Sequence, residues 1–116
     1  MISDWFGLTV PSDDLGCLQD IHWSMAAFGY FPTYTLGNLY AAQLLEAMAA
    51  DLGDVDEMVA SGDWKPMLDW LRPRIHQRGS QVSPAQLIED ATGSPPSPEP
   101  FLRYVERKYS ALYQLG

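Results

Sequence analysis

Apolar residues recur three and four positions apart along nearly the whole chain, the spacing that gathers them on one face of a helix. No stretch alternates apolar and polar residues for long enough to suggest a strand. The pattern therefore predicts an all-α fold. The length of 116 residues predicts one domain, 1–116, built as a compact, bundle-like array of about five to six helices.

Capping and helix-breaking residues divide this pattern into segments. Asp54 with Glu57, and Ser83 with Gln86, have the spacing of a capping box, which marks the first turn of a helix. Pro73 lies inside a helical stripe, where it removes a backbone donor, so we expect a kink there. After an irregular start with one turn of helix, the expected helices are 14–27, 33–52, 54–60, 64–77, 84–92 and 98–113.

Composition excludes several classes of function. The net charge of −8 opposes binding to a phosphate backbone, so nucleic acid is not an expected partner. No run approaches the ~20 apolar residues of a membrane span, and the first residues do not resemble a signal peptide. Cys17 is the one cysteine, so no intrachain disulfide can form. We expect a reducing, cytoplasmic location and a buried, inert thiol.

The segment 16–23, Gly-Cys-Leu-Gln-Asp-Ile-His-Trp, concentrates polar chemistry. On a helix, Gln19, His22 and Trp23 share one side, because residues three and four apart are neighbours. The carboxylate of Asp20 lies nearby, and two tyrosines follow in the segment 29–34. Two interpretations stay open from residue types alone: an interior polar cluster with satisfied hydrogen bonds, or a functional site.

Five positions of this segment match a known signature, G-x-x-Q-D-x-H-W: Gly16, Gln19, Asp20, His22 and Trp23. With the sequence that follows, Phe-Gly-Tyr-Phe-Pro-Thr-Tyr-Thr-Leu-Gly-Asn-Leu-Tyr, the chain resembles the C-terminal portion of the Taq-type zinc metallocarboxypeptidases. The resemblance implies an all-helical zinc exopeptidase, usually dimeric, that releases single residues from the C-termini of peptides. The expected partners are peptide C-termini and either a second copy or the missing N-terminal part.

The metal-binding motif of that family is not in this sequence. Family members hold zinc, or cobalt in its place, through His-Glu-x-x-His and a downstream glutamate. This chain has two histidines, His22 and His76, and neither belongs to such a motif. We therefore expect no metal site and no peptidase activity from the chain alone, and an exposed position for His76.

The resemblance implies roles for the remaining polar residues. His22 and Tyr34, with Tyr30 as the alternative tyrosine, are expected to stabilise the transition state in the intact enzyme. Gln19 and Asp20 are expected substrate-binding residues, and Asp20 has the further options of orienting His22 or capping local structure. Gly16 and Trp23 are expected to be structural. The alternative function is a stand-alone helical protein-interaction module derived from the enzyme.

Overall fold

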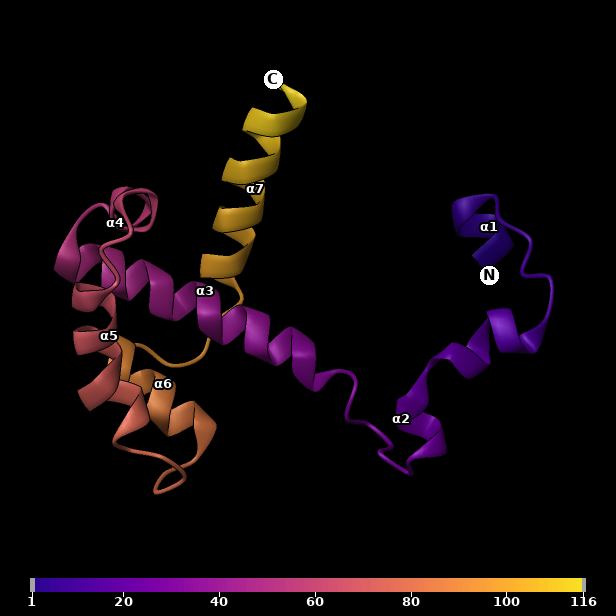
Figure 1. Ribbon diagram of the computed structural model, residues 1–116, viewed down its shortest axis with the longest axis horizontal. Helices are drawn as coiled ribbons and strands as arrows, with labels where there is room; N and C mark the ends of the chain where they lie inside the picture. Colours follow the sequence, from indigo (N-terminus) through magenta and orange to yellow (C-terminus); the bar gives the residue numbers. More distant parts are fainter. Residues whose placement is uncertain (1, 116) are drawn as a thin grey trace. The chain divides into compact units, whose positions relative to one another are not determined.

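The computed structural model describes residues 2–115, apart from the side chains of Ile2 and Trp23. The chain divides into two compact units, Met1–Tyr34 and Thr35–Gly116, and each is described by itself. In the described residues all secondary structure is helical, which confirms the all-α prediction (Figure 1). The single domain over 1–116 stays a prediction. The elements are α1 (Ile2–Phe6), η1 (Asp13–Leu15), η2 (Cys17–Gln19), α2 (Ile21–Ser24), α3 (Thr33–Leu52), α4 (Val55–Ser61), α5 (Lys65–Leu71), η3 (Arg72–His76), α6 (Pro84–Thr92) and α7 (Glu99–Tyr113).

The long helix α3 has the predicted bounds. Near its start, the hydroxyl of Thr33 donates to the carbonyl of Tyr30 at 2.7 Å. It ends before Gly53, which takes a left-handed φ of 92° that favours glycine. Asp54 then caps α4 by accepting a hydrogen bond from the backbone N–H of Glu57 at 2.9 Å.

At Pro73, where the sequence predicts a kink, the helix changes type. The α-helix α5 ends at Leu71, and the next turn, η3, is π-helical. Its closing bond runs from the N–H of Gln77 to the carbonyl of Arg72 at 2.9 Å. Proline has no N–H and its ring crowds the preceding turn, which explains why the regular ladder stops here. After η3, Ser83 caps α6 as expected.

The core of the second unit joins α3, α4 and α5. Met48, Val55 and Trp70 are buried against one another, with Trp70 only 4% exposed. Partly buried residues from the same elements complete the cluster: Leu44, Ala47, Leu52, Met67 and Leu71. Burial of a side chain of this kind stabilises a fold by about 1.5–3 kcal/mol, so this cluster holds the three helices together.

Polar contacts fix the edge of this core. The indole N–H of Trp70 donates to Oδ2 of Asp51 at 2.7 Å. The guanidinium of Arg74 donates to the same oxygen at 3.1 Å and lies 4.5 Å from the centre of the indole ring. The buried tryptophan therefore keeps a hydrogen-bond partner and gains a cation–π contact.

Gln43, 5% exposed, joins α3 to the connection between α6 and α7. Its amide nitrogen lies 3.1 Å from each of three acceptors, the hydroxyl of Thr92 and the carbonyls of Ser94 and Pro95. Its side-chain oxygen accepts from the N–H of Ser97 at 3.0 Å. One buried amide thus satisfies backbone groups that have no helical partner.

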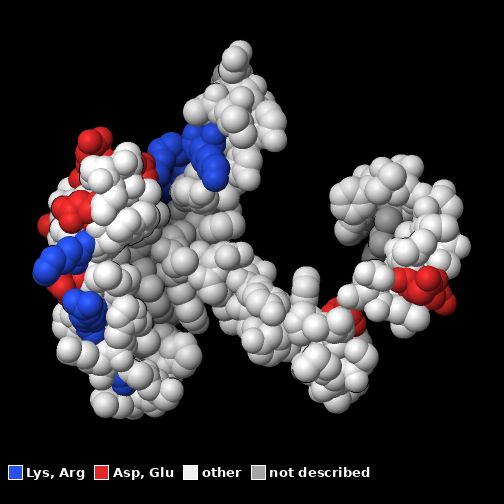
Figure 2. Space-filling view, in the orientation of Figure 1, with Lys and Arg blue, Asp and Glu red and all other residues white. Residues whose placement is uncertain are grey.

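Surface ion pairs decorate the second unit, and Figure 2 shows acidic and basic side chains interspersed over α4 and α5. Arg103 of α7 binds Glu46 of α3, with distances of 2.8 and 2.9 Å from one nitrogen to the two carboxylate oxygens. Hydrogen bonds from Gln86 and then from Arg78 lower the pKa of Asp90 below its ordinary value. These groups are exposed, so each pair adds little to stability. No helix within the described residues is long and apolar enough to cross a membrane.

The Gln43 contacts predict a stability effect. Replacing Gln43 with Ala removes the partner of the Ser97 N–H and of the Pro95 carbonyl, so the free energy of unfolding should fall by about 1–3 kcal/mol. Urea titration followed by circular dichroism measures this. Gln81→Ala is the matched control, because Gln81 is exposed. Equal stability of the two variants would contradict the role assigned to Gln43.

Candidate functional site

The segment that carries His22 is not one continuous helix, and the prediction of a helix over 14–27 is wrong. Two short 3-10 turns, η1 and η2, precede the single turn α2, and Asp20 separates η2 from α2 in an extended conformation, with φ −82° and ψ 104°. Gln19 and His22 therefore do not share one helix side. The side chain of Trp23 lies outside the described residues.

Asp20 is the residue that interrupts the helix. Its Oδ1 accepts a hydrogen bond from the backbone N–H of His22 at 2.9 Å, the N-cap arrangement that aspartate favours. The same oxygen lies 2.6 Å from Nδ1 of the His22 ring. The side chains of His22 and Asp20 are 20% and 29% exposed. The structure thus places Asp20 beside His22, and the orienting role stays a prediction.

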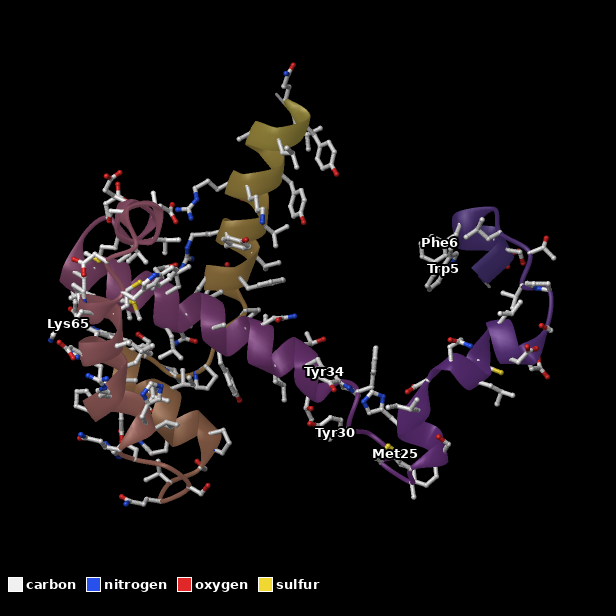
Figure 3. All side chains as sticks on the ribbon, in the orientation of Figure 1. Trp5, Phe6, Met25, Tyr30, Tyr34 and Lys65 are labelled. Atoms are coloured by element: carbon white, nitrogen blue, oxygen red, sulfur yellow. The ribbon has the colours of Figure 1, made fainter. Side chains whose placement is uncertain are left out.

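Three aromatic rings of the following loop and of α3 surround the imidazole. Tyr30 stacks on it, with ring centres 5.5 Å apart and an angle of 24° between the planes. Phe31 and Tyr34 meet it edge-on at 5.5 and 5.8 Å. Figure 3 shows Tyr30 and Tyr34 adjacent where the loop enters α3. The hydroxyl of Tyr34 lies 3.4 Å from Nε2 of His22.

Both expected tyrosines therefore meet His22, by different parts of their side chains. Tyr34 presents its hydroxyl to the imidazole, and Tyr30 presents its ring face. Phe31 was not expected at the site. The sequence offered only its place among aromatic neighbours as a signal, and that place does not distinguish a core residue from one that holds a functional ring.

Gln19 and Gly16 lie in the turns that lead to Asp20. The side-chain amide nitrogen of Gln19 donates to the carbonyl of Asp14, so it closes the loop around η1 and η2. A Cβ on Gly16 would lie 2.6 Å from Cγ1 of Val10 and 3.3 Å from the carbonyl oxygen of Ser12. Glycine is thus required here by space, which supports the structural role expected of Gly16.

Two other polar residues are separate from the site. Cys17 is exposed on η2, a short turn none of whose residues is buried, so the expectation of a buried thiol is wrong. His76 is exposed at the end of η3, as expected. Among residues 2–115, no three His, Cys, Asp or Glu side chains converge as metal ligands would. The described side chains therefore do not fit a metal centre.

The arrangement around His22 suits the stabilisation of negative charge. A protonated imidazole donates from both nitrogens, and a tyrosine hydroxyl donates one proton. Nε2 of His22 and the hydroxyl oxygen of Tyr34 are 3.4 Å apart. An oxygen atom can therefore sit within about 2.7–3.1 Å of both, the distance expected of oxyanion donors.

An all-helical chain that carries the motif of segment 16–23, with a tyrosine hydroxyl 3.4 Å from the histidine of that motif, is typical of one class of protein, the metallocarboxypeptidases. The chain belongs to the carboxypeptidase Taq (M32) metallopeptidase family, whose profile matches residues 1–109. The resemblance noted from the sequence, to the C-terminal portion of such an enzyme, is confirmed.

Individual relatives agree with this assignment. The chain is 54% identical over 110 residues to thermostable carboxypeptidase 1 of Thermus thermophilus, covering 95% of this chain and 22% of the relative. It is 41% identical over 112 residues to carboxypeptidase 1 of Bacillus subtilis, covering 97% and 22%. The chain thus spans about a fifth of the length of these curated relatives.

Solved structures show the same fold. Metallocarboxypeptidase 1 of Trypanosoma cruzi superimposes with a TM-score of 0.84 at 40% identity, covering 93% of this chain and 23% of that one. The M32 carboxypeptidase of Deinococcus radiodurans superimposes with a TM-score of 0.85 at 36% identity, covering 98% and 23%. The helical arrangement of this chain is therefore the arrangement found in a part of those larger enzymes.

The packing at Gly16 predicts a pair of effects. Gly16→Ala should disturb the turns before Asp20, because the new Cβ meets Val10 at 2.6 Å. Val10→Ala removes the atom that it meets and should restore part of the loss. Hydrogen exchange of the backbone amides of residues 13–24 measures both. Protection that is unchanged in Gly16→Ala, or not regained in the double variant, would contradict this reading of the turn.

Proposed function

We propose that this chain is the C-terminal segment of a zinc-dependent carboxypeptidase that releases C-terminal residues from peptides. In that enzyme it contributes His22 and Tyr34 as transition-state donors. The family match over residues 1–109 carries the proposal. The contact between the His22 ring and the Tyr34 hydroxyl also supports it, because it brings two possible hydrogen-bond donors together.

Hydrolysis of a peptide bond builds negative charge on the carbonyl oxygen of the substrate. A donor that meets this oxygen in the transition state lowers the barrier, and the loss of one donor typically costs about 2.7–4 kcal/mol. His22 and Tyr34 are the donors that we propose. The ring of Tyr30 holds the imidazole, which makes its hydroxyl the second choice.

The substrate-binding roles follow from which atoms are engaged. Gln19 uses its amide nitrogen within the chain, so its side-chain oxygen is the atom that we propose for the peptide backbone. Asp20 contacts His22 through Oδ1, and a contact with substrate is the second role that we propose for it. For Asp20 the role in binding substrate has less support than the contact with His22, because the contact with His22 is the one observed.

The metal and the general base are proposed to come from outside this segment, since the side chains that the structure describes do not fit a metal centre. Zinc, or cobalt in its place, belongs to the full-length enzyme in this proposal. The partners of the segment are then peptide C-termini, the N-terminal part of the enzyme and a second copy of it, in the cytoplasm. Alone, the chain is proposed to be inactive.

A chimaeric enzyme tests the donor roles. The chain replaces the segment that it matches in thermostable carboxypeptidase 1 of Thermus thermophilus, and release of the C-terminal residue from a blocked dipeptide is measured. His22→Ala should lower kcat by about 10²–10³-fold, and Tyr34→Phe by a similar factor, because each removes a donor. Tyr30→Phe keeps the ring that stacks on His22 and should leave kcat nearly unchanged.

His76→Ala is the matched histidine control, since His76 is exposed and separate from the site. A His22→Ala chimaera that is as active as the His76→Ala chimaera would refute the donor role. Release of the C-terminal residue by the isolated 116-residue chain with zinc or cobalt, abolished by a chelator, would refute the proposed inactivity.

The alternative function, a helical interaction module, is favoured by one observation. Large apolar side chains of the first unit are exposed, among them Trp5 at 73%, Met25 at 71% and Phe28 at 69%. Trp5 and Phe6 project together from α1 in Figure 3. Exposed apolar groups of this size typically mark a surface that another protein covers.

Light scattering measures the self-association of the isolated chain and so tests whether it has a protein-binding face. We expect self-association that weakens when Trp5 and Phe6 are both replaced with Ser, because these side chains are exposed. Replacement of the exposed charged residues Asp13 and Asp14 with Ser is the control. A monomer that binds no hydrophobic dye would argue against a protein-binding face on this unit.

A further inference from the structure

The two nitrogens of the His22 ring have chemically different partners. Nδ1 lies 2.6 Å from a carboxylate oxygen of Asp20, and Nε2 lies 3.4 Å from the hydroxyl of Tyr34. An ionised carboxylate only accepts hydrogen bonds, whereas a tyrosine hydroxyl both donates and accepts. The Asp20 side of the ring therefore decides which nitrogen carries the proton.

A second contact of the same oxygen excludes the opposite arrangement. Oδ1 of Asp20 also accepts from the backbone N–H of His22 at 2.9 Å. An unprotonated Nδ1 would set its lone pair against this oxygen at 2.6 Å, and no proton would lie between them. With the proton on Nδ1, the contact becomes a short, charge-assisted hydrogen bond.

The aromatic neighbours keep the ring in this orientation. A half-turn of the imidazole would exchange Nδ1 and Nε2 with carbon atoms and lose both polar contacts. Tyr30 on the ring face and Phe31 at the ring edge, each with its centre 5.5 Å away, restrict the rotamers of His22. The ring orientation is thus held by packing as well as by hydrogen bonds.

We propose that Asp20 is a positioning residue that fixes neutral His22 as the Nδ1–H tautomer. Nε2 then accepts a hydrogen bond from the hydroxyl of Tyr34. Asp20 then acts through His22 rather than on the substrate. When both side chains are neutral, the one proton between Nε2 of His22 and the hydroxyl oxygen of Tyr34 is bonded to Tyr34. His22 donates from Nε2 only when its ring is protonated to the imidazolium. This catalytic consequence rests on the proposed function, whereas the tautomer itself does not.

Nitrogen-15 NMR of the histidine rings tests the proposal on the 116-residue chain. The sequence has two histidines, so exposed His76 serves as an internal reference in every spectrum. At about pH 8.5, where an ordinary histidine is neutral, we expect His22 to be mainly the Nδ1–H tautomer and His76 to resemble free histidine. A His22 ring protonated mainly on Nε2 would overturn the proposal.

Two variants assign the cause. Serine at position 20 can still cap the backbone N–H of His22, but its neutral hydroxyl both donates and accepts, so Asp20→Ser should move His22 toward the tautomer ratio of His76. Tyr34→Phe removes the partner of Nε2 and should leave the Nδ1–H tautomer in place. An unchanged tautomer in Asp20→Ser, or a reversed one in Tyr34→Phe, would assign the control to a residue other than Asp20.

Backbone amide signals of residues 13–34 report whether Asp20→Ser keeps its local fold. If it does not, the wild-type spectrum and Tyr34→Phe still decide the question. The outcome is separate from that of the chimaera: a His22 tautomer set by Asp20, in an enzyme whose kcat does not need His22, would refute the proposed function and leave this inference standing.

Discussion

Oδ1 of Asp20 accepts two hydrogen bonds from the same residue, one from the backbone N–H of His22 and one from its ring. The first bond starts α2 and ends the run of 3-10 turns, so the local chain path depends on it. The second sets the ring that faces Tyr34. Because one atom makes both bonds, the path of the backbone and the direction of the imidazole cannot change independently.

The second unit depends on another polar side chain, Gln43, in a different way. Its amide satisfies backbone groups of the connection between α6 and α7, where no helix supplies partners. Burial of the apolar cluster around Trp70 stabilises the fold but depends little on orientation. The hydrogen bonds of the Gln43 amide, by contrast, form only within a narrow range of distances and angles. In both units a buried or partly buried polar group therefore specifies a chain path that hydrophobic burial alone leaves open.

Many large apolar side chains of the first unit are exposed. The chain belongs to the M32 family and spans about a fifth of the length of the curated relatives it matches. In the function proposed above, His22 and Tyr34 are one part of a peptidase mechanism, and the metal comes from outside this chain.

The sequence by itself determined the helical class, the bounds of α3 and the caps at Asp54 and Ser83, because periodicity and capping are local properties of the chain. It also determined the family, since the motif around His22 is read directly from residue order. Only the tertiary structure decided that segment 14–27 is broken at Asp20, because a side chain there competes with the helical ladder for the same N–H. It alone decided that Tyr34 meets His22 by its hydroxyl and Tyr30 by its ring, since those contacts depend on how the loop folds back on α2.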